Sequence, residues 1–217
     1  MRLKITLILT LFIKIGFGQY FYNDSIISLY VDKLIDNKID TILIYENGCF
    51  GCDEPIFLMY PDTCIDLNQE PLVSYVIWRK NNIDYITKLS TYDCFYYTTI
   101  KYDFKKIWDF CVINEKTINQ EKLLPPTYYN NHDTLQLFID HHGYTSVKLY
   151  LKDRLLVYEI NDFYLIKKID DKFINLNFDK NINTYQIQLR DLIDKEIQKI
   201  DKLNLIEKKK NGLQHTI

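Results

Sequence analysis

The sequence predicts an α+β fold: a mainly antiparallel sheet with hairpins, flanked by an N-terminal helix, a middle helix and a long C-terminal helix. Two stretches, 72–89 and 146–160, are rich in strand-forming residues on either side of a short polar break, which is typical of a β-hairpin. Three other stretches repeat apolar residues at the spacing of an amphipathic helix. Together these patterns predict a sheet with helices packed against it.

The three helices are recognised by their apolar faces and by residues that suit their ends. Asp24 is expected to cap the first helix, over 25–37, and Asp103 precedes the second. The third and longest is expected from about Thr184 to Lys208. The basic run Lys208-Lys209-Lys210 is expected to close it, because cations complement the C-terminal end of a helix dipole. The residues assigned to the three apolar faces are Ile26, Ile27, Tyr30, Val31, Leu34 and Ile35; Phe104, Ile107, Trp108, Cys111 and Val112; and Leu189, Leu192, Ile193, Ile197, Ile200 and Leu203.

The strands are expected between these helices. Thr41–Tyr45 contains only β-branched, aliphatic and aromatic residues and predicts a buried strand, which Asn47-Gly48 is expected to end. The first hairpin turns across Lys80-Asn81-Asn82. Residues 134–139 fit a helix or a strand, and we prefer a strand because 146–160 continues as a meander. Further strand is expected at 163–169 and 173–178.

Length and composition are those of a folded globular chain. The 217 residues, 47% hydrophobic and 15% aromatic, exclude a disordered chain. They predict a single α+β domain over 19–217, with two halves divided near 125–131 as the alternative. Alanine is absent while Ile, Asn, Lys and Tyr are abundant, and we interpret this as the codon bias of an AT-rich bacterial genome.

Residues 1–18 have the parts of a signal peptide. Arg2 and Lys4 form a positive start, 5–13 an apolar run, and Gly16-Phe17-Gly18 a small-x-small cleavage site. The sequence therefore predicts an exported protein, periplasmic or secreted, whose mature chain begins near Gln19. No transmembrane segment is expected after removal of the leader.

The charge balance argues against nucleic acid as a partner. The formal net charge is −2, and loss of Arg2, Lys4 and Lys14 with the leader makes it about −5. A nucleic-acid-binding domain is expected to carry a basic stripe instead. Eighteen tyrosines favour a protein or glycan partner, because tyrosine provides rigid amphipathic contact surface. The densest aromatic patches are Tyr92, Phe95, Tyr96 and Tyr97, and Tyr128 and Tyr129.

Cys49-Phe50-Gly51-Cys52 directly follows the predicted strand, and a strand that leads into C-x-x-C resembles the thioredoxin-like active site. That resemblance implies thiol–disulfide chemistry through Cys49 and Cys52. The sequence departs from the pattern, because no tryptophan precedes Cys49 and Pro55 disfavours the helix that should follow. We therefore prefer a structural role for this pair, as a disulfide or as two thiols that shape a loop. Of the five cysteines, Cys111 is expected to be buried and unpaired.

Two short histidine-containing segments are the weak candidates for a metal site. They contribute His132, Asp140, His141 and His142, whose imidazole and carboxylate groups suit a divalent cation. These residues lie at opposite ends of one predicted element, so their spacing is poor for a shared ion. The sequence predicts no catalytic residue, no metal and no cofactor.

These observations predict an exported bacterial protein with a non-enzymatic binding or structural role. A thiol–disulfide function through Cys49 and Cys52 is the alternative, and a metal-dependent hydrolase is the second alternative.

Overall fold

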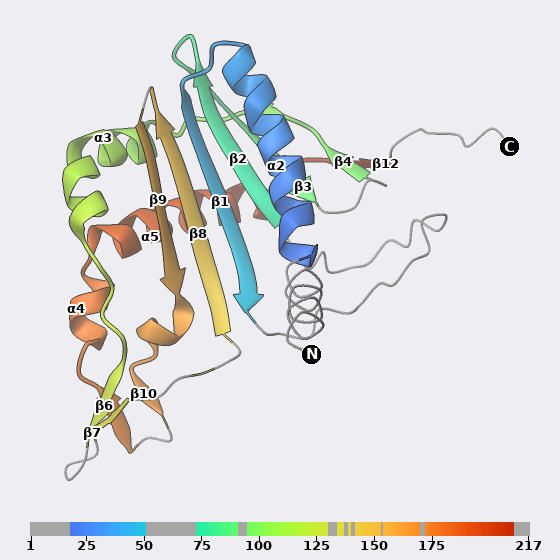
Figure 1. Cartoon of the computed structure of the whole chain (residues 1–217). Helices are drawn as coiled ribbons and strands as arrows, with labels where there is room; N and C mark the ends of the chain where they lie inside the picture. Colours follow the sequence, from blue (N-terminus) through green and yellow to red (C-terminus); the bar gives the residue numbers. More distant parts are fainter. Residues whose placement is uncertain are drawn as a thin grey trace, which may run out of the picture.

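The computed structural model describes residues 18–50, 73–90, 95–129, 134–136, 139, 142–152, 154–169 and 172–210. Within these ranges the chain forms a six-stranded antiparallel sheet with helices on both faces, a four-stranded antiparallel sheet, and a two-stranded pair (Figure 1). The predicted α+β class, with its N-terminal, middle and long C-terminal helices, is confirmed. Most of the predicted leader lies outside the described residues.

The six-stranded sheet is arranged around β1, its most N-terminal strand. β1 lies between two hairpins that are far apart in sequence, one on each side. The strands in spatial order are β5 (Ile100–Lys101), β3 (Ile83–Ser90), β2 (Val73–Lys80), β1 (Thr41–Phe50), β8 (His142–Leu151) and β9 (Arg154–Asn161). The predicted turn of the first hairpin is confirmed, and it consists of Asn81 and Asn82, with φ of 51° and 61°. Two consecutive positive φ angles are typical of a type I′ turn, which matches the twist of the flanking strands.

The expectation that Asn47-Gly48 ends the first strand is wrong. β1 continues to Phe50, and its last residues pair with β8 as far as Phe50 opposite His142. The Asn47 side chain accepts a hydrogen bond from the Thr145 hydroxyl across the strand pair, at 2.9 Å. The ring of Tyr144 occupies the space that a side chain at position 48 would need, so a larger residue there would force the ring to move. Cross-strand contacts therefore override the turn propensity of this dipeptide.

Helices cover the two faces of the sheet unequally. α2 (Gly18–Asp36) packs on one face, while α3 (Lys105–Gln120) and α5 (Tyr185–Lys202) pack on the other (Figure 1). α2 begins before the predicted cap Asp24, which lies within the helix. α5 is capped by Thr184, whose side chain accepts a hydrogen bond from the Ile187 amide.

The basic run at 208–210 does not close α5. α5 ends at Lys202, and Lys208–Lys210 forms strand β12, which pairs with β4 (Phe95–Tyr97). Three residues assigned to helix core faces are exposed, namely Ile35 (44%), Val112 (65%) and Leu203 (64%). Ile35 and Val112 each directly follow a buried residue and are rotated by about 100° from it, and Leu203 is the C-cap beyond α5.

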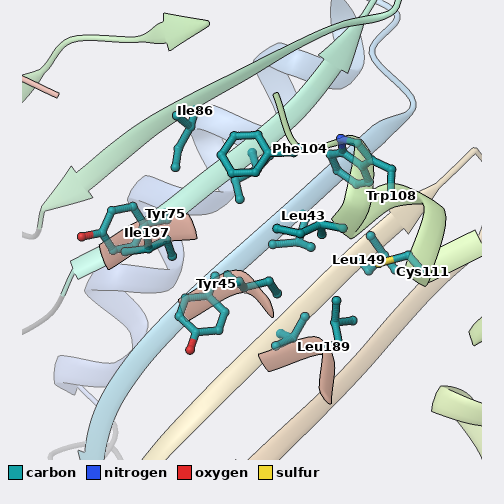
Figure 2. Packing of buried hydrophobic residues seen from close by; sticks show 14 of the residues in the cluster. Leu43, Tyr45, Tyr75, Ile86, Phe104, Trp108, Cys111, Leu149, Leu189 and Ile197 are labelled. Atoms are coloured by element: carbon teal, nitrogen blue, oxygen red, sulfur yellow. The ribbon is translucent and has the colours of Figure 1, made fainter. Parts of the chain in front are cut away.

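Each face of the sheet has its own hydrophobic core. The larger core joins Leu43 and Tyr45 of β1 to α3 and α5, and Figure 2 shows Trp108 and Cys111 of α3 packed against it. The smaller core joins alternate residues of the same strands to α2. Its buried members are Ile27, Val31, Leu34, Ile39, Ile42, Ile44, Val76 and Trp78.

The four-stranded sheet is built from short segments. Its strands in spatial order are β10 (Lys168–Ile169), β11 (Phe173–Asn175), β6 (Thr127–Tyr129) and β7 (Thr134–Gln136). Strand structure at 134–136 is confirmed, but β7 pairs with β6 and does not continue into the β8–β9 meander. The expected strand segments at 163–169 and 173–178 are each only partly strand, because the 3₁₀ helix η1 (Asp162–Leu165) and the start of α4 (Phe178–Ile182) interrupt them.

Three tyrosine hydroxyls attach α5 to the rest of the larger core. Tyr45 of β1 donates a short hydrogen bond to Asp194. Tyr75 of β2 donates to Asp201 at 2.7 Å, and Tyr102 donates to Glu196 at 2.9 Å. The acceptors of these hydrogen bonds are Asp194, Glu196 and Asp201, all on α5. Each bond satisfies a polar group at the edge of an apolar interface, so the contacts also fix where α5 lies on the sheet.

We predict that Tyr45→Phe lowers the free energy of unfolding at pH 7 by about 1–3 kcal/mol, because it leaves a half-buried carboxylate without its donor. Burial and the Asp194 carboxylate hold the pKa of Tyr45 above its ordinary value near 10. The protonated phenol therefore stabilises the fold below about pH 10, and that contribution is lost as the pH rises further.

Urea unfolding at pH 7 and at several values between 9 and 11 tests this prediction. The variant should lose less stability than the wild type above pH 10. Tyr129→Phe, at an exposed tyrosine, is the matched control and should change neither quantity. Equal stability of wild type and Tyr45→Phe at pH 7 would contradict the role given to this contact.

Candidate binding groove along strand β9

The cysteines were the first candidates from the sequence. Cys49 lies near the end of β1, opposite Gly143 of β8, and it is disulfide-bonded. Cys52 lies outside the described residues, so its pairing with Cys49 stays a prediction. Cys111 is a buried free thiol on α3, as expected. Burial raises the pKa of Cys111 to about 12, which keeps it protonated and unreactive at neutral pH.

The histidine candidates are only partly described. His142 begins β8, and its Nδ1 lies 3.2 Å from the carbonyl oxygen of Ile139. His132, Asp140 and His141 lie outside the described residues. Among the residues that are described, no three histidine, cysteine, aspartate or glutamate side chains are grouped as metal ligands would be. A metal site therefore stays a hypothesis that this structure does not test.

Polar groups gather at the His142 end of β8, beneath the sheet. Burial raises the pKa of Asp162, while the positive charge of Arg190 and the proximity of His142 oppose that shift. The Asp162 carboxylate lies so close to Gly143 that a side chain at position 143 would require the carboxylate to move. The neighbouring Asp194 accepts the hydrogen bond of Tyr45, so these acids lie in the packing between β8, η1 and α5. We assign them to the support of the fold.

A groove lies beside β9 on the described surface. β9 is the last strand of the six-stranded sheet and, among the described residues, pairs only with β8. A cavity of about 500 Å³ lies along it, and we call this cavity the β9 groove. Its walls are formed by 156–159 and Asn161 of the β9 side, by Ile118, Asn119 and 121–123 at the end of α3, and by Tyr164 and Gln186.

No helix among the described residues covers one of the two faces of β9. α2 lies over β1, β2 and β3, whereas β8 and β9 extend beyond it (Figure 1). Leu155 and Val157 point to this uncovered face and are 52% and 59% exposed. Their partners across β8 are Tyr150 and Lys148. Two large apolar side chains on one exposed edge strand therefore adjoin the β9 groove.

The charges of the groove are not equivalent. Glu121 is already engaged, because its carboxylate accepts the backbone N–H of Tyr185 at 2.7 Å and caps α5. Glu159 has no salt bridge or hydrogen bond among the described residues. Burial raises the pKa of Glu159, and the nearby His142 only partly offsets this. Of the two acids in the groove walls, Glu159 is thus the one whose charge a bound cation would stabilise.

Tyr158 adds a donor beneath the same strand. Its hydroxyl is buried and has no hydrogen-bond partner among the described residues. Burial raises the pKa of Tyr158 well above its ordinary value, so the hydroxyl stays protonated. The groove itself could not be predicted from the sequence, because the alternation of Leu155 to Ile160 predicts two apolar faces of the strand but not which of them lacks a helix. The exposure of Leu155 and Val157 depends on which strands α2 covers, and this is set by the packing of the whole domain.

Comparisons of the chain with protein-family models, with curated proteins and with solved structures found no match. Among the described residues, no helix has both the length and the apolar character needed to cross a membrane.

We predict that Cys49 and Cys52 stabilise the fold and do not catalyse thiol–disulfide exchange. Asp53 and Glu54 follow Cys52 directly, and their charges disfavour a thiolate beside them. The purified mature chain should show no insulin-reductase and no thiol-oxidase activity. Replacing both cysteines by serine should lower stability by about 2 kcal/mol, the loop-entropy value for so short a closed loop. Exchange activity that disappears in Cys49→Ser would show that the pair is catalytic.

Proposed function

We propose that this chain is an exported, non-enzymatic binding protein whose β9 groove takes an extended segment of a partner protein. The observation that carries the proposal is the outer edge of β9, which pairs with no other described strand and has a groove of about 500 Å³ beside it. An edge strand presents unpaired backbone N–H and C=O groups, and an extended chain can pair with them as an additional strand.

The dimensions of β9 suit a short peptide. β9 has eight residues, Arg154–Asn161, which corresponds to about 27 Å of strand at ~3.4 Å per residue. A partner strand placed against this edge would cover Leu155 and Val157 with its own side chains. Removing these exposed apolar surfaces from water favours association, and the backbone bonds fix the register.

The charge of the groove defines the partner more closely. Glu159 lies in the groove wall without a salt bridge among the described residues. A lysine or arginine in the partner strand would compensate its partly desolvated carboxylate. The proposed ligand is therefore an extended segment with alternating apolar residues and at least one basic residue. A glycan remains the other partner class that the tyrosine content favours, and the binding experiment includes it.

Export is the first prediction of this proposal. Positive residues, an apolar run and a small-x-small site at 1–18 support a leader that is removed after Gly18. Intact-mass measurement of the protein made in its native host should give a chain that begins at Gln19 and is found outside the cytoplasm. A full-length product in the cytoplasm would contradict the proposed location.

The second prediction concerns the β9 groove. Random twelve-residue peptides displayed on phage are selected on the mature chain, and the enriched sequences should alternate apolar residues and contain lysine or arginine. Hydrogen exchange should slow at β9 amides when a selected peptide is added, because strand addition protects the outer edge. Glu159→Lys should weaken that binding roughly tenfold.

Glu207→Lys makes the same charge change at a residue that does not line the β9 groove and is the matched control. It should leave the affinity unchanged. A second readout separates folding from binding: Glu159→Gln should keep or raise stability at pH 7, because the raised pKa of Glu159 means that its charged form costs stability there. If the selected peptides bind but leave hydrogen exchange at the β9 amides unchanged, the β9 groove is not the binding site. If the chain binds glycans on an array and no peptide is selected, the partner is a glycan and not a protein segment.

A further inference from the structure

The outer edge of β9 has a composition that suits pairing with a copy of itself. Natural edge strands are usually protected by charges, proline or a covering element, because an open edge can template a further strand. The sequence of β9 is R-L-L-V-Y-E-I-N, with no proline and with four uncharged residues, 155–158, between its two charges. No described strand pairs with the outer side of β9, where the sheet ends (Figure 1).

The two faces of this strand differ in how much apolar surface they leave in water. Leu156 lies on the face of the larger core and is only 6% exposed. Leu155 and Val157 lie on the opposite face and are 52% and 59% exposed. A strand added at the outer edge brings its own side chains beside these two and removes part of their surface from water.

A twofold axis restricts which residues of two identical strands can meet. In antiparallel pairing, residues directly opposite each other lie on the same face of the sheet. With Leu156 at the axis, Leu155 of each copy lies opposite Val157 of the other, so the contact between the exposed apolar residues occurs twice. The paired residues are then 154–158 of both copies.

The neighbouring registers are less favourable. With Val157 at the axis, Glu159 of each copy lies opposite Leu155 of the other, which places a carboxylate against the apolar pair. With Leu155 at the axis, only 154–156 remain in the pairing, because β9 begins at Arg154. The register with Leu156 at the axis is therefore the one that best matches the exposed side chains.

We propose that two copies of the mature chain form a dimer by antiparallel pairing of β9 with β9, with Leu156 at the twofold axis. Each copy covers the outer edge of the other, and the six-stranded sheet continues from one copy into the next. Such a contact is isologous, so it closes at two copies and does not propagate into a fibre.

The dimer also regulates access to the β9 groove. This consequence rests on the proposed function, whereas the self-pairing does not. Glu159 lies outside the paired residues 154–158, so a second copy leaves its partly desolvated carboxylate uncompensated. A partner segment that carries a basic residue compensates this charge and is therefore expected to displace the second copy.

The size of the contact predicts a weak dimer. Stable interfaces bury roughly 800 Å² per partner through about 20–30 residues a side, and five paired residues provide much less. We expect a dissociation constant of about 10–300 μM, which leaves the dimer reversible.

Sedimentation equilibrium of the mature chain from about 10 μM to about 0.5 mM tests the dimer. The average mass should rise toward twice that of one chain. Val157→Lys should weaken association at least tenfold, because it places two cations at the contact, and Leu155→Lys provides the same test if the first variant does not fold. Leu29→Lys, at a leucine of α2 that is 61% exposed, is the matched control and should leave association unchanged.

Cross-linking tests the register. Leu155→Cys and Val157→Cys are made as separate chains, and a mixture of the two should form a disulfide-linked dimer on oxidation. Either variant alone should form much less, because its introduced thiols are one step out of register. The unsubstituted chain, oxidised in the same way, gives the background from its own five cysteines.

The self-pairing is overturned if the chain remains a monomer at about 0.5 mM, or if Val157→Lys and Leu29→Lys associate equally. Stronger cross-linking of Val157→Cys with itself than with Leu155→Cys overturns the register. These experiments contain no peptide, so a dimer that forms while no peptide is selected supports self-pairing and contradicts only the proposed function. A selected peptide that slows exchange at β9 but leaves the dimer intact overturns the regulatory consequence.

Discussion

Strand β1 is buried on both of its faces. This constraint determines where α2, α3 and α5 pack on the six-stranded sheet. Ile42 and Ile44 face α2, while Leu43 and Tyr45 face α3 and α5, and all four are at most 2% exposed. Burying such aliphatic side chains contributes about 1.5–3 kcal/mol each, but only if both faces are covered. With helices on only one face, two of these four side chains would stay in water and would not contribute this free energy. The three-layer arrangement is therefore required by four consecutive residues.

Coverage of the sheet is complete at β1 and incomplete at β9. α2 packs on β1, β2 and β3, and no helix of the described part of the chain covers the same face of β9. Natural sheets usually protect their edges with charge, short strands or a covering loop. β9 has eight residues and keeps Leu155 and Val157 exposed, so the protection is weak. The proposed binding edge follows from how far the N-terminal helix extends across the sheet.

Much of the fold was predictable because the patterns were periodic and local. The hairpin at 73–90, the apolar stripe of α5 and the burial of Cys111 each depend on a few adjacent residues whose spacing sets the face they occupy. The errors concern contacts between distant residues. Asn47-Gly48 has the composition of a turn, but its contacts with Tyr144 and Thr145 keep it in a strand. The lysines at 208–210 have the composition of a helix end, but they pair with β4 as a strand. The β9 groove also depends on such distant pairings, so no local pattern predicts it.

The pairing of β1 with β8 has a consequence for the order of events in time. Thr41 pairs with Leu151, 110 positions later, and Tyr45 bonds to Asp194, 149 positions later. Contacts of such sequence separation form slowly, because a long loop must close before they contribute. A growing chain that stops short of α5 leaves the inner face of β1 in water, so the domain completes its core only when nearly the whole polypeptide is available. A chain that postpones folding in this way stays extended for longer after synthesis, and an extended chain is the form that can be threaded through a narrow channel.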